Sequence, residues 1–316
     1  MTRILLPFDG SPSARLAARY AAALVQGSGG SVEQVTLIYI SGGSYLARHV
    51  QNVDLRVVRL EQTAEWQRLK EQRLAQEIRP LLAEGREILS RAGVQVPVDI
   101  QVGAGRIGEQ LLSIARQGGY TAIIMGRRGL SPFKELLLGS VTQYVLTHAQ
   151  GMTVFVVGQG YGEASASPLF PLLLPVDGSA TSLAAVRQAA RLVQGWQPGP
   201  PRLELLHVVD LALLGQTLTG DAQLLVAEGH QALVAARAIL DEAGLKEGVA
   251  EKLVSGNPPL GIAQEAKQLQ CHLVFMGSVG HSVLDRLIIG SVTQSVLHLT
   301  PQATIGVLYP TVDESS

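Results

Sequence analysis

The chain has 316 residues, which is enough for two domains of ordinary size. Hydrophobic residues make up 47% of it and charged residues 16%, a balance that fits globular cores and excludes a chain disordered along most of its length. The formal net charge of −1 gives no overall attraction to nucleic acid or to an anionic membrane, so we expect neither as a partner.

The two halves carry opposite charge. Residues 1–157 contain 17 Lys and Arg against 12 Asp and Glu, whereas residues 158–316 contain 8 against 14. Opposite signs favour contact between the halves, but two separately solvated surfaces explain them as well.

Cysteine content and hydropathy indicate the compartment. The single cysteine, Cys271, excludes a disulfide within the chain, and its strand-like surroundings predict an inert core thiol. No apolar run approaches the roughly 20 residues that span a bilayer, and no signal-peptide pattern precedes the first strand. We therefore expect a cytoplasmic protein without a membrane span.

Each half opens with the same strand and turn, Leu-Pro-x-Asp-Gly-Ser, at residues 4–11 and 172–179. Asp9 and Asp177 stand at the carboxyl end of a first strand, where parallel α/β sheets bind ligands. Asp-Gly-Ser is also a common turn that aspartate braces by itself, so a purely structural role stays open. The candidate contacts are Pro7, Asp9, Gly10, Ser11, Pro175, Asp177, Gly178 and Ser179.

Second strands are predicted at 35–39 and 203–209, with Ile38 and His207 as candidate contacts. We interpret His207 as a strand-end residue, because no partner nucleophile accompanies it. The first half then has 17 extra residues within 48–79, rich in Arg, Glu and Gln. This insertion predicts an additional or extended helix, which is either a solvated element or a partner-binding arm.

Third strands follow. In the first half we expect one at 94–100, which leads to Gly105, and its counterpart in the second half leads to Gly256. The two glycines are 151 residues apart, and both join the candidate contacts.

A glycine loop then occurs in both halves, after apolar fourth strands predicted at 121–125 and 271–275. It reads Gly, two residues, Gly, nine residues, Gly-Ser, and the copies are offset by 151 residues at every position. Glycine lets backbone N–H groups approach a ligand, and the helix that begins at Gly-Ser presents unpaired N–H groups. The pattern therefore predicts a phosphate site. The candidates are Gly126, Arg127, Arg128, Gly129, Gly139, Ser140, Val141, Gly277, Ser278, Gly280, Gly290, Ser291 and Val292.

Each half closes with a fifth strand, at 153–157 or 304–308. The element order predicts two doubly wound five-stranded parallel sheets of the Rossmann-like α/β class, with strand order 3-2-1-4-5 and helices on both faces. The first and fourth strands are then neighbours, which brings the aspartate next to the glycine loop. We expect the apolar fifth strands to pair with each other, and the whole chain to form a homodimer.

The expected domain boundaries follow from these elements. The first domain covers residues 1–158 and the second covers 169–310. A Gly-, Ser- and Ala-rich linker at 159–168 separates them, and 311–316 form a tail.

These motifs resemble those of the universal stress protein family, over essentially the whole chain and as two tandem domains of the ATP-binding type. The resemblance implies that the aspartate and the second strand hold the nucleoside of ATP, with or without Mg²⁺, while the glycine loop and Gly-Ser hold the phosphates. Neither half has lost the glycine pattern, so we expect both to bind ATP. The first half departs at Arg127-Arg128, where the family often has a small residue. If only one site is occupied, we expect it in the second half.

The leading functional hypothesis is a nucleotide-binding regulatory or stress-response protein without dedicated catalysis. The sequence has no Walker lysine, metal-ligand cluster or Ser-His-Asp set repeated in both halves. Two alternatives stay open. One is a slow ATPase or nucleotidyl-transfer enzyme, and the other is an interaction module that binds no nucleotide.

Overall fold

The computed structural model describes residues 2–42, 68, 71–129, 138–162, 167–194, 196, 202–210, 212, 222–280 and 289–310. Most of the insertion expected at 48–79, part of the linker at 159–168 and the whole tail at 311–316 lie outside these ranges.

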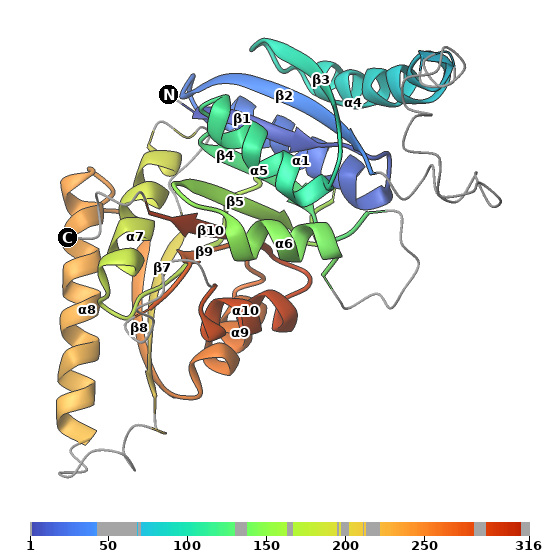
Figure 1. Ribbon diagram of the computed structural model, residues 1–316. Helices are drawn as coiled ribbons and strands as arrows, with labels where there is room; N and C mark the ends of the chain where they lie inside the picture. Colours follow the sequence, from blue (N-terminus) through green and yellow to red (C-terminus); the bar gives the residue numbers. More distant parts are fainter. Residues whose placement is uncertain are drawn as a thin grey trace, which may run out of the picture.

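The strands form one ten-stranded sheet with the order β3-β2-β1-β4-β5-β10-β9-β6-β7-β8 (Figure 1). Each half has the predicted 3-2-1-4-5 order, and neighbouring strands within a half are parallel, so the doubly wound α/β fold is confirmed. The strands are β1 (Thr2–Pro7), β2 (Val32–Ser41), β3 (Val98–Ala104), β4 (Ala122–Gly126), β5 (Met152–Val157), β6 (Leu172–Pro175), β7 (Leu203–Asp210), β8 (Val249–Gly256), β9 (Leu273–Gly277) and β10 (Thr304–Tyr309).

Helices cover both faces of this sheet, and each face has one apolar core that runs through both halves (Figure 1). The described parts of one face are packed by α1 (Pro12–Gly27), α4 (Arg79–Arg91), α7 (Ala180–Val193) and α8 (Ala222–Glu242). The other face is packed by α5 (Ile107–Gln117), α6 (Ser140–His148), α9 (Pro258–Gln268) and α10 (Ser291–Leu299). A π-helical turn, η2 (Leu74–Ile78), precedes α4.

The third strand of the first half begins later than predicted. We expected it at 94–100, but β3 begins at Val98. The N–H of Val94 donates to the Leu89 carbonyl (3.1 Å), so Val94 is tied to the end of α4, which stops at Arg91, and does not yet pair in the sheet. Pro97 has no N–H to give to a ladder, and its carbonyl accepts from Val35 (3.0 Å) where the chain enters the sheet.

The fifth strands pair with each other, as predicted; the pairing is antiparallel and joins the halves into the one sheet. Phe155 lies directly opposite Gly306. These two residues are 151 positions apart, the offset that relates the halves, so the approximate twofold relation passes through this pair. A Cβ on Gly306 would be 2.3 Å from Phe275 Cδ2, and the Phe155 and Phe275 rings are 5.9 Å apart between centroids. Glycine on one side of the axis therefore makes room for two phenylalanine rings.

Two side chains donate hydrogen bonds across the junction of the halves, which is the β5–β10 pair with its flanking helices. Their acceptors are equivalent backbone carbonyls. The Tyr309 hydroxyl donates to the Leu146 carbonyl in α6, and the Arg127 guanidinium donates to the Leu297 carbonyl in α10. Arg127 is 2% exposed, and burial lowers its pKa to about 10. The Leu297 carbonyl lies near the C-terminus of its helix, where the dipole favours a cation. Arg127 thus contacts the other half of the chain.

The second half has a partly buried charged cluster where the first half has a neutral hydrogen bond. In the first half, the Tyr120 hydroxyl donates to Thr36 Oγ1 (2.8 Å). In the second, Lys252 Nζ lies 2.5 Å from Glu265 Oε2, while Glu204 Oε1 is buried with no hydrogen-bond partner among the described residues. Burial and then the neighbouring Glu265 carboxylate raise the pKa of Glu204.

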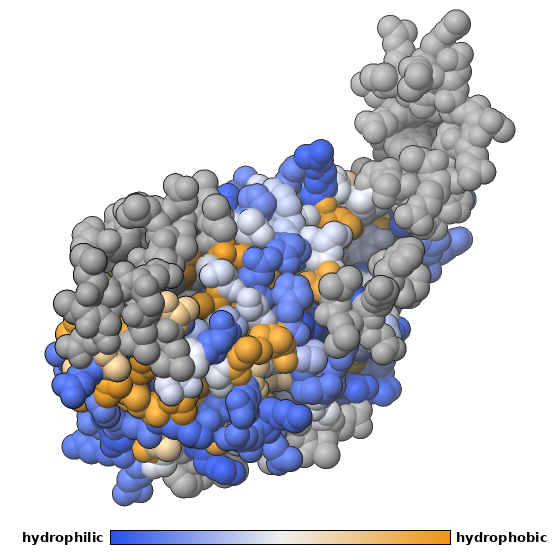
Figure 2. Space-filling view, turned by 90° about the horizontal axis from the view of Figure 1, so that it is seen from below, coloured by the Kyte–Doolittle hydropathy of each residue, from blue (hydrophilic) through white to orange (hydrophobic). Residues whose placement is uncertain are grey.

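No helix within the described ranges is both long and apolar enough to cross a bilayer. Seen from below, several apolar patches lie among hydrophilic residues (Figure 2). The exposed large apolar side chains include Leu224, Val234 and Leu260. Scattered exposure of this kind is ordinary on a folded protein.

Gly306→Ala tests the packing at the junction. The added Cβ meets the Phe275 ring inside a close-packed core, so we expect the free energy of unfolding to fall by about 1–3 kcal/mol. Gly162→Ala is the matched control, because a Cβ there has no atom within 4 Å. Thermal and denaturant unfolding of both variants provide the measurement. Equal stability of the two would mean that the junction is not tightly packed.

Glu204→Gln tests the buried cluster. A pKa raised in the folded state means that the folded protein retains a proton that the unfolded chain has released. Stability is then lost as pH rises from the unfolded towards the folded pKa. We expect the variant to melt above the wild-type protein at pH 8, with the gain shrinking near pH 4 as the wild-type carboxyl becomes protonated. Melting curves across this range decide it, and a gain that does not vary with pH would contradict the assignment.

Candidate functional site

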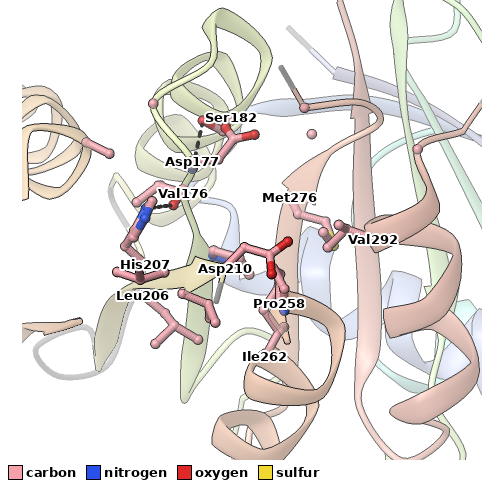
Figure 3. A pocket seen from close by; sticks show the side chains of 18 of the residues that line it. Val176, Asp177, Ser182, Leu206, His207, Asp210, Pro258, Ile262, Met276 and Val292 are labelled. Carbon is pink, nitrogen blue, oxygen red and sulfur yellow. Dashed lines mark hydrogen bonds between the residues drawn. The ribbon is translucent and has the colours of Figure 1, made fainter. Parts of the chain in front are cut away.

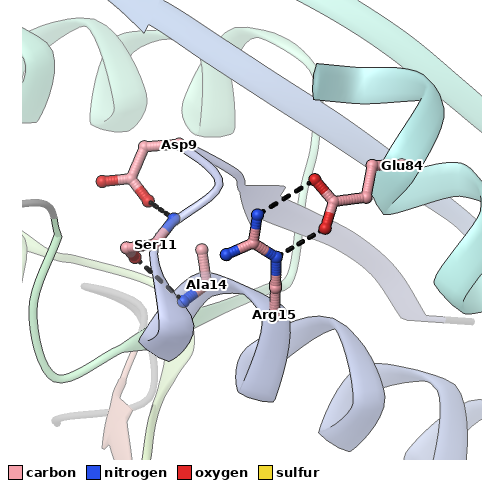
Figure 4. Close-up of polar contacts among 5 residues, drawn as sticks. All are labelled: Asp9, Ser11, Ala14, Arg15 and Glu84. Atoms are coloured by element: carbon pink, nitrogen blue, oxygen red, sulfur yellow. Dashed lines mark hydrogen bonds and ion pairs between the residues drawn. The ribbon is translucent and has the colours of Figure 1, made fainter. Parts of the chain in front are cut away.

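The first β–α turn is braced in the same way in both halves. Asp9 Oδ1 accepts from the N–H of Ser11 (3.0 Å), and Asp177 Oδ1 accepts from the N–H of Ser179 (2.9 Å). Ser11 then caps α1 with its hydroxyl oxygen (Figure 4), and Ser179 caps α7 in the same way. One oxygen of each aspartate therefore has the structural role that the sequence left open.

The other carboxylate oxygen faces the glycine loop. A Cβ built on Gly129 would lie 2.5 Å from Asp9 Oδ2, and one on Gly280 would lie 2.4 Å from Asp177 Oδ2. The parallel pairing of β1 with β4, and of β6 with β9, produces this approach. The predicted meeting of aspartate and loop is confirmed in both halves, and the contact supplies a reason for glycine that the sequence did not show.

Each loop is closed onto the helix that follows it. The N–H of Gly139 donates to the Arg127 carbonyl (2.8 Å), and that of Gly290 donates to the Ser278 carbonyl (2.7 Å). Two threonines that sequence reasoning did not select, Thr142 and Thr293, donate through Oγ1 to the carbonyls of the first loop glycines (3.1 and 3.0 Å). Their signal was present, since Gly-Ser-Val-Thr-Gln is identical in both halves.

Gly139 and Gly290 are the N-cap residues of α6 and α10, and no side chain caps either helix. Their first N–H groups and the positive end of the helix dipole therefore point past the loop. Ser140 and Ser291, at the first helical positions, are exposed beside them. This geometry suits an anion such as phosphate.

A cavity of about 870 Å³ lies against the glycine loop and the start of α10 in the second half (Figure 3). Nine of the predicted residues line it: Pro175, Asp177, Gly178, His207, Gly277, Gly280, Gly290, Ser291 and Val292. The residues that form the side walls of the cavity were not predicted from the sequence. The α8 wall consists of Leu225, Glu228, Gln231, Ala232 and Ala235, and the opposite side is formed by Asp210 in β7 and by Pro258 and Ile262 in α9. These residues are spread over three elements and form no local motif.

His207 is held in one orientation at the edge of this cavity. Its Nδ1 lies 2.8 Å from the Val176 carbonyl, which can only accept, so we assign the proton to Nδ1. Gly229 in α8 leaves room for the imidazole, because a Cβ there would be 2.6 Å from His207 Cδ2.

The remaining predicted residues lie at or near the ends of strands. Gly105 and Gly256 have φ of +128° and +152°, so glycine is required there by the backbone between strand and helix. In the first half, Phe8 follows Pro7 and its N–H donates to the Ile38 carbonyl (2.9 Å), which joins the ends of β1 and β2.

Arg127 and Arg128 diverge at the first loop. The Arg127 side chain points to the other half and donates to the Leu297 carbonyl. The Arg128 backbone packs against the N-cap of α6, because a Cβ on Gly139 would be 3.2 Å from the Arg128 Cα. Within the described residues, no group of three or more His, Cys, Asp or Glu side chains is arranged to hold a metal ion.

A double-mutant cycle tests the contact between aspartate and loop. Gly280→Ala forces Asp177 to give up its bond to Ser179, so we expect a loss of about 1 kcal/mol in unfolding free energy. In an Asp177→Ala background the same change should cost less, because the carboxylate is absent. Thermal unfolding without nucleotide gives both values. Equal costs in the two backgrounds would exclude the contact.

Comparison with known proteins gives results of three kinds. The model of the universal stress protein family matches residues 1–157 and again 170–305. The universal stress protein MJ0531 of Methanocaldococcus jannaschii is 28% identical over 131 residues, which are 40% of this chain and 74% of that protein. A universal stress protein of Mycolicibacterium smegmatis is 29% identical over 182 residues, or 55% of this chain and 57% of that protein.

A solved structure extends the likeness to the whole chain. A universal stress protein from Archaeoglobus fulgidus aligns with a TM-score of 0.67 at 21% identity, and the alignment covers 98% of this chain and 97% of the other. At this identity the likeness shows the fold alone. The two family matches together cover most of the sequence, and the chain therefore belongs to the universal stress protein family, with two copies of the family's domain.

Proposed function

We propose that this protein binds ATP in the cavity of the second half. The observation that carries the proposal is the continuity of that cavity. It runs from the glycine loop and the N-terminus of α10 to the wall formed by α8, and it includes nine residues selected from the sequence. Its volume of about 870 Å³ falls within the usual range for small-molecule sites, roughly 300–1,000 Å³.

The residues at the two ends fit the two ends of a nucleotide. At one end, the loop of Gly277 and Gly280 and the uncapped start of α10 offer backbone N–H groups to phosphates. Mg²⁺ would be held largely by phosphate oxygens and water, since it commonly takes few protein ligands in such sites.

The other end offers apolar walls and a few polar groups. Leu206, Val208 and Ile262 supply apolar surface, while Asp210 and Glu228 supply carboxylates able to accept from ribose hydroxyls or an exocyclic amino group. A mostly apolar cleft with a few convergent polar groups is the usual form of a cofactor site.

Within this proposal the protein acts by binding ATP, as a cytoplasmic regulatory protein that forms homodimers. Family membership supports a stress-response role. The competing ATPase hypothesis is examined by incubating the protein with ATP and measuring ADP over time. Release of ADP well above that of a Ser291→Asp variant would favour catalysis in this cavity.

Ser291→Asp tests the phosphate end. An aspartate at the first position of α10 suits the helix dipole, so we expect the fold to retain its stability. The same charge repels phosphate, so we expect the Kd for ATP to rise at least about tenfold, which corresponds to about 1.4 kcal/mol.

Isothermal titration calorimetry gives this affinity, and Ser291→Ala separates loss of the hydroxyl from gain of the charge. We expect the alanine variant to bind ATP with a Kd within a few-fold of the wild-type value. Unchanged ATP affinity in a folded Ser291→Asp protein would mean that the start of α10 does not hold phosphate.

A further inference from the structure

We propose that the nucleoside of ATP can enter the second half but not the first, and that two positions on one helix, together with Arg15 and Arg73, decide this. The positions are Leu81 and Glu84 in α4, which correspond to Ala232 and Ala235 in α8. The proposal rests on the nucleotide site proposed above for the second half. It replaces the expectation of two equivalent ATP sites with one ATP per chain.

The correspondence of the two helices is fixed at their C-terminal ends. Gly93 and Gly244 both have φ of +81°. The N–H groups of Val94 and Leu245 each donate to the carbonyl five residues earlier, at 3.1 and 2.9 Å. All four residues keep the offset of 151 positions that relates the glycine loops.

In the second half, the helix wall beside the first turn is made of small residues. Ala232 and Ala235 line the cavity, with Gly178 of the β6–α7 turn also on its surface. The α7 residue one turn after the cap is Leu183, whose N–H donates to the Ser179 carbonyl (3.0 Å). Because the two alanine side chains are only methyl groups, the space between α8 and the turn stays open and forms part of the cavity.

In the first half, larger side chains occupy the corresponding places. A Cβ on Gly10 would lie 2.3 Å from Leu81 Cδ1, so the leucine rests directly against the turn. Arg15, which corresponds to Leu183, places its Nε 2.5 Å from Glu84 Oε1 and links α1 to α4 (Figure 4). The pair is part-exposed, with 40% and 39% of the side chains accessible, so it is in contact with solvent.

A third contact lies further out along the second strand. Arg73 donates from Nη2 to the Tyr39 hydroxyl and from Nη1 to Ser41 Oγ, both at 3.2 Å. The corresponding β7 residues, His207 and Val209, line the cavity of the second half. In the first half this part of the second strand is therefore engaged by a side chain of the chain itself.

These contacts lie where the nucleoside would bind in the first half. They leave the glycine loop and the start of α6, where phosphates would bind, unchanged. The first half keeps the loop closure at Gly139, the threonine bond of Thr142 and the uncapped start of α6. A nucleoside entering it would have to displace Leu81 from the turn and break the Arg15–Glu84 pair. The glycine motif alone therefore does not predict which half accepts ATP.

Equilibrium dialysis with ATP tests the stoichiometry. We expect one ATP per wild-type chain, loss of that ATP in Ser291→Asp, and retention of it in the matched first-half variant Ser140→Asp. Two ATP per chain, or one ATP kept by Ser291→Asp and lost by Ser140→Asp, would overturn the proposed asymmetry while nucleotide binding itself stood. No binding by the wild-type chain would instead refute the proposed function.

A reciprocal exchange tests the residues. In the Ser291→Asp background, the combined changes Arg15→Leu, Arg73→Leu, Leu81→Ala and Glu84→Ala should create an ATP site in the first half and restore about one ATP per chain. The opposite set, Leu183→Arg, Ala232→Leu and Ala235→Glu, should abolish binding in the second half.

Ala227→Glu is the matched control for the second set, because this exposed α8 residue does not line the cavity. We expect it to bind ATP as the wild-type protein does. Cooperative melting establishes that each variant is folded. A folded first-half variant that gains no ATP, or a folded second-half variant that keeps it, would show that these positions do not decide entry.

Discussion

The pairing of the first strand with the fourth in each half is the constraint on which the site depends. Parallel strands end at the same edge of a sheet, so the turn after β1 or β6 and the loop after β4 or β9 must meet there. The carboxylates of Asp9 and Asp177 are close enough to exclude any side chain from Gly129 and Gly280. The glycines therefore satisfy two requirements, close packing against the aspartate and an open backbone for a ligand.

The sheet joins two halves that repeat each other without being equal. The antiparallel pairing of β5 with β10 places Phe155 opposite its own counterpart, Gly306. A second large side chain at position 306 would collide with the phenylalanine rings, so the two equivalent positions carry different residues. Equivalent carbonyls in α6 and α10 are satisfied by different donors, Tyr309 and Arg127. A repeated backbone thus carries side chains that have diverged, and the side chains beside the first β–α turn of each half differ in the same way.

Much of the fold was predictable because it depends on local patterns that occur twice. Short apolar runs, capped helices and an offset of 151 residues were enough for the strand order, the pairing of the fifth strands and the contact between aspartate and loop. The start of β3 was not predictable, because the apolar run that begins at Val94 is first tied back to α4 by a backbone bond and enters the sheet only after Pro97.

The side walls of the site and the direction of Arg127 were beyond sequence reasoning. Ala232 and Ala235 read as ordinary helix residues until the β6–α7 turn is seen across from them. Arg127 lies within the glycine motif, and only the tertiary structure shows that its guanidinium reaches α10 of the other half. Contacts of this kind depend on which elements meet in space, and one sequence without relatives aligned to it does not record them.

A crystal structure of the chain grown with a non-hydrolysable ATP analogue tests the central claim most directly. We expect the analogue in the second half, with its phosphates at the start of α10 beside Gly280 and its nucleoside against the wall of Ala232 and Ala235. An analogue bound at another place on the chain, with the second-half cavity empty at saturating concentration, would contradict the account.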